Sequence, residues 1–289
     1  MSRRAGGVGE KRVGSMGIGV NRYLHWLCYL SGMNCSAWNR RLLLSLVLLA
    51  TRPATAESMA EFDDAVARLQ FAFYTADTRS LEEMLSLLAA FEVDGNLPAA
   101  KSYQLAYGQW KLAQLYSQPP DERVRPNAKA AAAKAAKACV QHAGESIAKD
   151  PRMADAYAIE ALCDNFSPVS PGGGSAACAR SKSMRTALSL GGDNPRVHFV
   201  ESLCSPDAEG DAVAIDRWRA VVARFEAAPP SQPGKPDWGH AEALTLLGAS
   251  YLKRGEVVAA RDVLERALVL APDYRQAQKL LQTAATRPK

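Results

Sequence analysis

The spacing of hydrophobic residues along most of the chain is that of amphipathic helices. Over 61–75 and again over 80–92, apolar residues recur every three or four positions. This period places the apolar side chains on one face of a helix, whereas the alternation typical of strands is nearly absent. The pattern therefore predicts an all-α protein that begins, after its leader, with a helix pair over 57–97.

Further helices and loops are predicted downstream. Residues 98–117 form a helical pattern with an aromatic-rich face, and 127–149 are rich in alanine, the best helix former. Two stretches rich in Pro, Gly and Ser, 166–175 and 227–237, predict long loops. Proline breaks recur at Pro151, Pro195 and Pro272. The aromatic residues of the 98–117 face are Tyr103, Tyr107, Trp110 and Tyr116.

The stretch 241–274 carries the most complete pattern. Gly248 and Ala260 are small enough for two antiparallel helices to approach closely, and Tyr251 and Leu264 fill the space between them. Pro272 ends the second helix. With these five residues, Leu244, Leu247 and Ala267 fall on the positions of one tetratricopeptide repeat (TPR), which the stretch resembles.

The resemblance extends beyond this single repeat. Residues 150–162, 190–202 and 235–274 resemble segments of uncharacterised exported bacterial TPR proteins. This implies a TPR-like helical-hairpin solenoid, or superhelix, over 98–285, with its best-defined repeat at 241–274 and a capping helix at 272–284. It implies no enzymatic activity.

In a TPR, fixed positions of the first helix of each repeat line a concave groove. The resemblance therefore implies a groove that binds an extended peptide or a helix of a protein partner. The alternative is plain solvated helix surface. The implied groove residues are Glu242, Thr245, Ala249, Leu252 and Lys253 in the best repeat, and Asp155, Arg196 and Phe199 in earlier ones.

Two functions follow from these expectations. The first is a non-enzymatic periplasmic scaffold or adaptor that docks a protein or peptide in an open concave groove. The alternative is a periplasmic small-molecule-binding accessory protein similar to the TPR components of solute transporters. That alternative needs a closed tunnel or pocket, for which the aromatic face of 98–117 is the candidate lining.

Motifs for catalysis are missing from the sequence. It holds no nucleophile elbow, phosphate-binding loop, dinucleotide fingerprint or zinc-binding spacing. We therefore expect no enzyme, no metal and no cofactor.

The charge of the chain is concentrated in its leader. Residues 1–56 hold eight Lys or Arg and one acid, Glu10, although the whole chain carries a formal charge of only +5. The remainder is close to neutral. Because nucleic-acid binding normally needs a basic face, we expect no nucleic-acid partner.

The leader has the features of a secretory signal. Arg40 and Arg41 precede the apolar run 42–50, which is too short to span a membrane, and Ala54-Thr55-Ala56 supplies a cleavage site. We predict a signal peptide over 33–56, cleavage after Ala56, a periplasmic location and no stable transmembrane segment in the mature chain. Residues 1–32 are then a mis-assigned extension; the alternative is an amphipathic segment that holds the chain at a membrane.

Four cysteines, an even number, follow the leader. In an oxidising compartment they allow three pairings. Cys163 and Cys178 flank the loop at 166–175, which favours a disulfide between them. Cys139 and Cys163 are equally distant from Pro151 and form an alternative pair. Packing of reduced cysteines between helices is the third interpretation.

Overall fold

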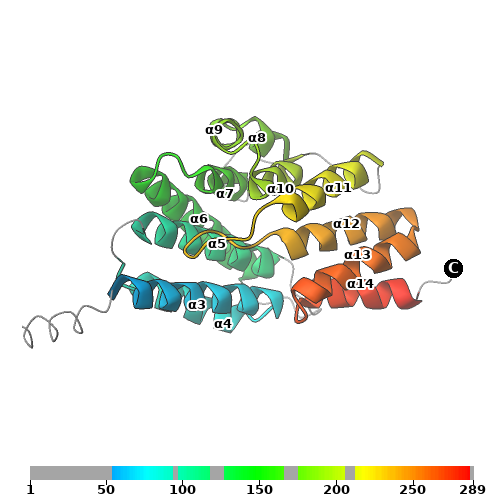
Figure 1. Ribbon diagram of the computed structural model, residues 1–289, viewed down its shortest axis with the longest axis horizontal. Helices are drawn as coiled ribbons and strands as arrows, with labels where there is room; N and C mark the ends of the chain where they lie inside the picture. The colour runs from blue at the N-terminus through cyan, green and yellow to red at the C-terminus, as the bar shows by residue number, and fades with distance from the viewer. Residues whose placement is uncertain (1–53, 94–96, 118–126, 166–174, 206–211, 287–289) are drawn as a thin grey trace, which may run out of the picture. The chain divides into compact units, whose positions relative to one another are not determined.

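The computed structural model describes residues 54–93, 97–117, 127–165, 175–205 and 212–286, and all regular secondary structure within them is helical (Figure 1). The all-α prediction is confirmed for these residues. The helices are α3 (Ala54–Tyr74), α4 (Thr78–Ala90), α5 (Leu97–Ser117), α6 (Ala128–Lys149), α7 (Ala154–Asn165), α8 (Ser175–Arg180), α9 (Lys182–Leu190), α10 (Pro195–Cys204), α11 (Ala212–Ala227), α12 (His240–Arg254), α13 (Val257–Leu270) and α14 (Arg275–Thr286).

The described helices belong, apart from Ala54, to one compact unit, Thr55–Lys289. The predicted extension 1–32 lies outside the described residues, as does the predicted signal peptide up to residue 53. Helix α3 begins at Ala54, within the predicted cleavage site. No helix in the described part of the chain is long and apolar enough to cross a membrane.

Neighbours in sequence are also neighbours in space. The pairs α5–α6, α7–α9, α10–α11 and α12–α13 each pack together, and α6–α7 and α11–α12 join successive pairs (Figure 1). Helix α14 packs on α12 and α13. Helix α4 packs on α5, and Leu69 of α3 lies close to Gly108 of α5.

Local sequence explains where several helices begin. Asp77 caps α4 by accepting a hydrogen bond from the Ser80 backbone N–H at 3.0 Å. Asn194 caps α10 in the same way, and Pro195 occupies the first turn, where no backbone donor is needed.

The close approach of α12 and α13 depends on Gly248. A Cβ atom placed there would lie 2.6 Å from Leu264 Cγ, a distance that real contacts do not reach. This confirms the expectation that Gly248 lets the two helices of 241–274 pack tightly against each other.

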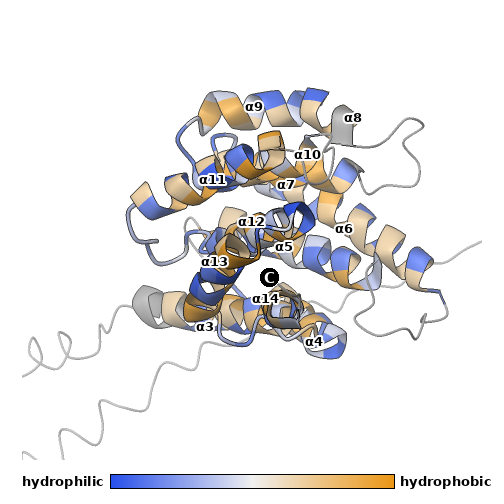
Figure 2. Cartoon of the chain, turned by 90° about the vertical axis from the view of Figure 1, so that its right-hand side faces the viewer, coloured by the Kyte–Doolittle hydropathy of each residue, from blue (hydrophilic) through white to orange (hydrophobic). Residues whose placement is uncertain are grey.

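The helices bury most of their large apolar side chains against neighbouring helices. Figure 2 shows hydrophobic and hydrophilic residues side by side around helices such as α9 and α13. The buried side chains form one continuous core from α3 to α14, and its most fully buried large side chains include aromatic residues of α3, α5 and α10. Burial of one such side chain contributes roughly 1.5–3 kcal/mol to folding.

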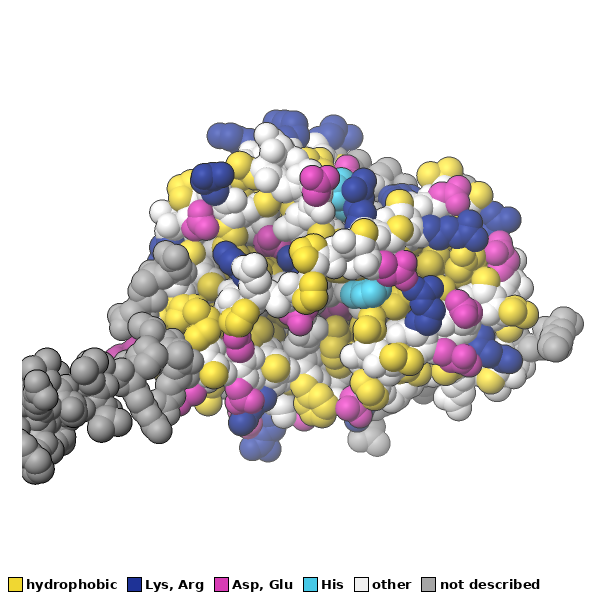
Figure 3. All heavy atoms as spheres, in the orientation of Figure 1, with side chains coloured by type: hydrophobic (Ala, Val, Ile, Leu, Met, Phe, Trp, Pro, Cys, Tyr) yellow, Lys and Arg dark blue, Asp and Glu magenta, His cyan; other side chains and the backbone are white. Residues whose placement is uncertain are grey.

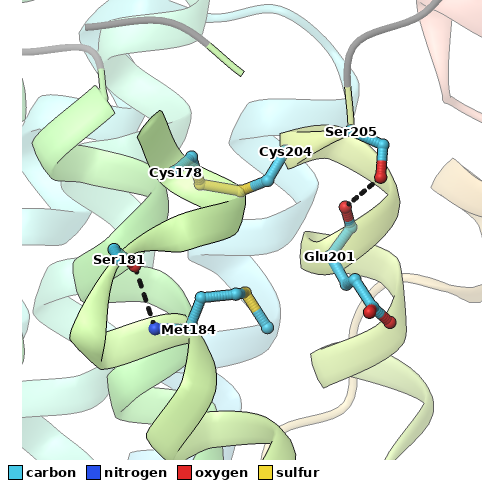
Figure 4. Close-up of a disulfide and its surroundings, with 6 residues drawn as sticks. All are labelled: Cys178, Ser181, Met184, Glu201, Cys204 and Ser205. Atoms are coloured by element: carbon cyan, nitrogen blue, oxygen red, sulfur yellow. Dashed lines mark hydrogen bonds between the residues drawn. A yellow bond between two sulfur atoms is a disulfide. The ribbon is translucent and has the colours of Figure 1, made fainter. Parts of the chain in front are cut away.

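Two disulfides fasten the middle of the chain, and neither is the predicted one. Cys139 of α6 pairs with Cys163 of α7, and Cys178 of α8 pairs with Cys204 of α10 (Figure 4). The Cys163–Cys178 pairing was wrong because flanking a loop does not fix which way two side chains face. The alternative Cys139–Cys163 pair forms because α6 and α7 pack together as successive helices.

Candidate functional site: a proline-rich strap and two open clefts

Residues 228–239, which we call the strap, run from α11 to α12 without forming a helix. Four of the twelve residues are proline, which lacks a backbone donor and cannot continue a helix. The strap includes most of the loop predicted at 227–237. It crosses the face that is turned toward the viewer in Figure 1, in front of α5.

Trp238 anchors the end of the strap in the core. Its ring stacks on Tyr107 with 4.9 Å between centroids, and lies edge-on to Trp110 at 5.5 Å and Phe199 at 5.6 Å. Its indole N–H donates to the Tyr103 hydroxyl at 2.6 Å, so the one polar atom of the buried ring is satisfied. Trp238 thereby joins the strap to both α5 and α10.

A second attachment holds the middle of the strap to α3. The backbone N–H of Gly234 donates to Asp63 Oδ1 at 2.9 Å. Across the Gly234 attachment, the Ser231 hydroxyl donates to Asp237 Oδ1 at 2.9 Å, which keeps the strap folded on itself. The strap is therefore an irregular segment held by one aromatic anchor at Trp238 and, in its middle, by the backbone hydrogen bond of Gly234.

Beside Trp238, Lys111 of α5 and Glu242 of α12 form a buried ion pair. Lys111 Nζ lies 3.1 Å from Glu242 Oε1, and the two side chains are 2% and 3% exposed. Glu242 Oε2 also accepts hydrogen bonds from the backbone N–H of Gly239 at 2.7 Å and from the Tyr74 hydroxyl at 3.2 Å. This single carboxylate therefore connects α3, α5 and the end of the strap.

Aromatic rings surround the ammonium group of Lys111. Its Nζ lies 3.7 Å from the centroid of Trp110 and 4.2 Å from that of Phe73, distances at which a cation is attracted to the ring face. Burial lowers the pKa of Lys111 to about 8, although the adjacent Glu242 carboxylate favours the charged form. Burial raises the pKa of Tyr107 and Tyr274 well above the usual value, and Glu242 raises both further.

A second ion pair joins α7 to α10. Arg196 Nε lies 2.8 Å from Asp155 Oδ1, and the amide of Asn194 donates to Asp155 Oδ2 at 2.7 Å. Asp155 is buried and Arg196 is half-buried. Most of the positive charge of Arg196 is therefore neutralised within the protein.

Of the open clefts that adjoin the strap within the described residues, two share residues 228–231. The first, the apolar cleft, has a volume of about 560 Å³ and lies between α3, the strap and the end of α13. Phe71 and Leu270, which line it, are 54% and 51% exposed. The second, the basic cleft, has a similar volume of about 560 Å³ and contains Arg224 and Lys235. Both clefts share Pro195, Arg196 and residues 228–231.

In Figure 3 the face crossed by the strap shows hydrophobic side chains among acidic and basic ones. The apolar cleft is lined by aromatic and proline side chains together with polar and charged ones. That lining contains Phe71, Tyr74, Phe225, Trp238, Pro229, Pro230 and Pro272. Such a surface can hold an apolar side chain of an extended polypeptide.

The structure brings some of the predicted groove residues together, but the strap of this same chain lies over them. Phe199 packs on Trp238, Glu242 binds the Gly239 backbone, and Arg196 lines both clefts. Phe199 and Glu242 are buried, so their contacts are with this chain's own strap. The repeat register identifies the helix faces, but it does not reveal that a loop lies on them.

The other predicted groove residues lie away from the two clefts. Thr245 and Leu252 are buried, Ala249 is half-buried, and Lys253 is exposed. None of the four lines the apolar or the basic cleft. Thr245 instead donates its hydroxyl to the Ala241 carbonyl within α12.

The aromatic face of 98–117, the candidate lining for a small molecule, is part of the core. Tyr103, Tyr107 and Trp110 are buried, and Trp238 fills the space beside them. Lys111 and Trp238 were missed by the sequence analysis. The available signals were a lysine within an aromatic helical pattern and a tryptophan at the end of a proline-rich loop.

Comparison with protein-family models and with curated proteins gives no match for this chain. Within the described residues, no group of three or more His, Cys, Asp or Glu side chains could hold a metal ion.

Proposed function

We propose that this protein is a non-enzymatic, TPR-like helical scaffold that binds an extended segment of a partner protein. The binding site of this proposal comprises the apolar and basic clefts beside the strap. The observation that carries it is the exposure of Phe71 and Leu270, two large apolar residues from different helices that both line the open apolar cleft. Large apolar side chains that remain exposed in a cleft are typical of interaction sites.

The strap supports the same function, because it is itself a proline-rich segment bound to the surface of these helices. It is an irregular, proline-rich segment that lies on α3, α5 and α10, held by the Trp238 ring and by backbone hydrogen bonds from Gly234 to Asp63 and from Gly239 to Glu242. A partner segment of similar conformation loses little conformational freedom on binding, because proline already restricts the backbone.

The TPR-like solenoid is supported by the packing of successive helix pairs. The pairs α5–α6, α7–α9, α10–α11 and α12–α13 follow one another along the unit, and Gly248 meets Leu264 at the point where the repeat pattern demands a close approach. Stacked pairs of this kind present extended surfaces to partners.

Export to the periplasm, through a signal peptide cleaved after Ala56, completes the proposal. Two disulfides favour an oxidising compartment, since such bonds are rare in reducing ones. The openness of the clefts favours a polypeptide over a small molecule, because small-molecule sites usually enclose most of the ligand surface.

Site-specific photo-crosslinking in cells tests the function. A photoreactive residue at position 71 or 270 should capture a defined set of partner proteins, whereas one at Val258, which is also exposed, should not. The variant Phe71→Glu/Leu270→Glu should lose these partners, and the matched variant Leu87→Glu/Val258→Glu should keep them. Equal capture from positions 71, 270 and 258 would rule out the clefts as the binding site.

A further inference from the structure

The apolar cleft carries two negative charges without internal partners. Asp237 and Asp273 both line it, both are exposed, and neither forms an ion pair within the described residues. Among the described residues, Asp237 accepts a hydrogen bond from the Ser231 hydroxyl alone. The other ionisable groups of the lining do not offset them, because Arg196 is bound by Asp155 and burial lowers the pKa of His240, which leaves its ring neutral.

The basic cleft has an excess of positive charge. Arg224 and Lys235 are exposed and form no ion pair in the described part of the chain. Asp193 is the acidic residue of this lining and is also exposed. With Arg196 neutralised by Asp155, the basic cleft keeps an excess of positive charge, whereas the apolar cleft beside it is negative.

We infer that the partner segment is charge-polarised: it places a large apolar residue flanked by Lys or Arg in the apolar cleft, and acidic residues in the basic cleft. The inference rests on the proposed function and specifies its ligand. Phe71, Leu270 and the aromatic walls take the apolar side chain, while Asp237 and Asp273 attract the basic ones. Arg224 and Lys235 attract the acidic end.

These charges contribute mainly to the specificity of binding and less to its affinity. An exposed ion pair strengthens an interaction by up to about fivefold, and it is weakened by salt. A peptide whose charges alternate places a repelled charge in both clefts, whichever way round it binds. We therefore expect a charge-polarised peptide to bind about tenfold more tightly than an alternating one of the same composition at low ionic strength.

The test uses fluorescently labelled twelve-residue peptides with blocked termini. One end carries Lys-Leu-Lys and the other Glu-Gly-Glu, with Pro, Ser and Ala between them, and the peptide is made in both chain directions. A control peptide of identical composition alternates Lys and Glu along its length. Binding to the disulfide-bonded protein is measured by fluorescence anisotropy in 50 mM salt.

Protein variants identify the charges responsible. Asp237→Asn/Asp273→Asn should reduce the preference to less than about twofold. The matched variant Glu61→Gln/Glu265→Gln also removes two exposed carboxylates, but outside both clefts, and should keep it.

The outcomes separate the two proposals. One polarised peptide binding about tenfold more tightly than the alternating control, with loss of that preference only in the Asp237/Asp273 variant, supports the inference. Equal binding of all the peptides, or equal loss in both variants, overturns the inference and leaves the proposed function standing. If no peptide binds and positions 71 and 270 capture no partner, the proposed function fails and the inference fails with it.

Discussion

Lys111 and Glu242 are far apart in the sequence and form an ion pair that is almost completely buried. Lys111 lies on α5, and Glu242 lies in the first turn of α12, directly after the strap. The pair therefore fixes where the strap ends and where the last helices begin. Removing two charges from water is costly, so the pair depends on both partners being present.

Removal of one partner should destabilise the protein strongly. Lys111→Met leaves the Glu242 carboxylate buried without its cation, and Glu242→Gln leaves the ammonium group without its anion. We expect each variant to lower the free energy of unfolding by about 3–5 kcal/mol. In the double variant Lys111→Met/Glu242→Gln, the free energy of unfolding should fall by less than the sum of the two single decreases, because no buried charge remains.

Urea unfolding followed by circular dichroism measures these differences. An exposed pair of the same type supplies the control: Arg79→Met, which breaks the surface pair with Glu83, should cost less than about 1 kcal/mol. Equal small effects at both sites would show that the buried pair contributes little to stability.

The buried lysine also predicts how stability depends on pH. The pKa of Lys111 is about 8 in the folded protein, against an ordinary value of 10.5. Between these values the unfolded chain holds a proton that the folded protein has released, so the Lys111 contribution to the free energy of unfolding increases as the pH rises from 8 to 10.5. The buried tyrosines act in the opposite direction above their ordinary pKa of 10, because the unfolded chain ionises first.

The two contributions are separated by comparing wild type with Lys111→Met at each pH. The tyrosine effect is common to both proteins and cancels in the difference. The wild type should therefore gain stability relative to the variant between pH 8 and pH 10. A difference that stays constant with pH would mean that Lys111 keeps an ordinary pKa in the folded state.

Trp238→Ala should release the strap. The substitution removes a ring packed on Tyr107, Trp110 and Phe199, and should lower the free energy of unfolding by about 3–5 kcal/mol. It should also make residues 229–236 more sensitive to limited proteolysis, because the Gly234–Asp63 hydrogen bond is then their main remaining attachment to the described helices.

The control for this experiment is Trp218→Ala in α11. Trp218 is equally buried and also packs on Phe199, so the loss of stability should be comparable. Its removal leaves both attachments of the strap intact. Similar cleavage of 229–236 in the two variants would contradict the anchoring role of Trp238.

The helices could be predicted from the sequence because their determinants are local. The period of apolar residues over 61–75 and 98–117, together with the capping and proline signals, depends on residues within a few positions of each other. The close helix pair of 241–274 follows from Gly248 for the same reason. These features need no knowledge of distant parts of the chain.

The candidate site depends on contacts between distant residues, and these could not be predicted. Trp238 donates its hydrogen bond to Tyr103 across 135 positions of sequence, and Gly234 reaches Asp63 across 171. The hydropathy pattern marks the strap as a loop but contains no information about where that loop lies. Consequently Glu242 and Phe199 were assigned to a partner, although they contact this chain's own strap.

The disulfides provide a direct test of connectivity. Peptide mapping under non-reducing conditions should find Cys139 linked to Cys163 and Cys178 linked to Cys204, and no link between Cys163 and Cys178. The paired cysteines are separated by 24 and 26 residues in the sequence. Replacing either pair by alanine should lower the free energy of unfolding by about 3 kcal/mol, because the unfolded chain gains conformational freedom. Unchanged unfolding after both pairs are replaced would contradict a stabilising role.

A final prediction compares two helical glycines that differ only in their surroundings. Gly248→Ala places a Cβ atom 2.6 Å from Leu264 Cγ, so α12 and α13 must move apart, and the free energy of unfolding should fall by about 1–3 kcal/mol. Gly144→Ala in α6 meets only Glu160 Oε1 at 3.9 Å. Since alanine is the better helix former, this second variant should be more stable than wild type by about 0.5–1 kcal/mol. Thermal or urea unfolding of both variants measures the contrast. If Gly248→Ala is also stabilising, the close packing of α12 on α13 does not exist in solution.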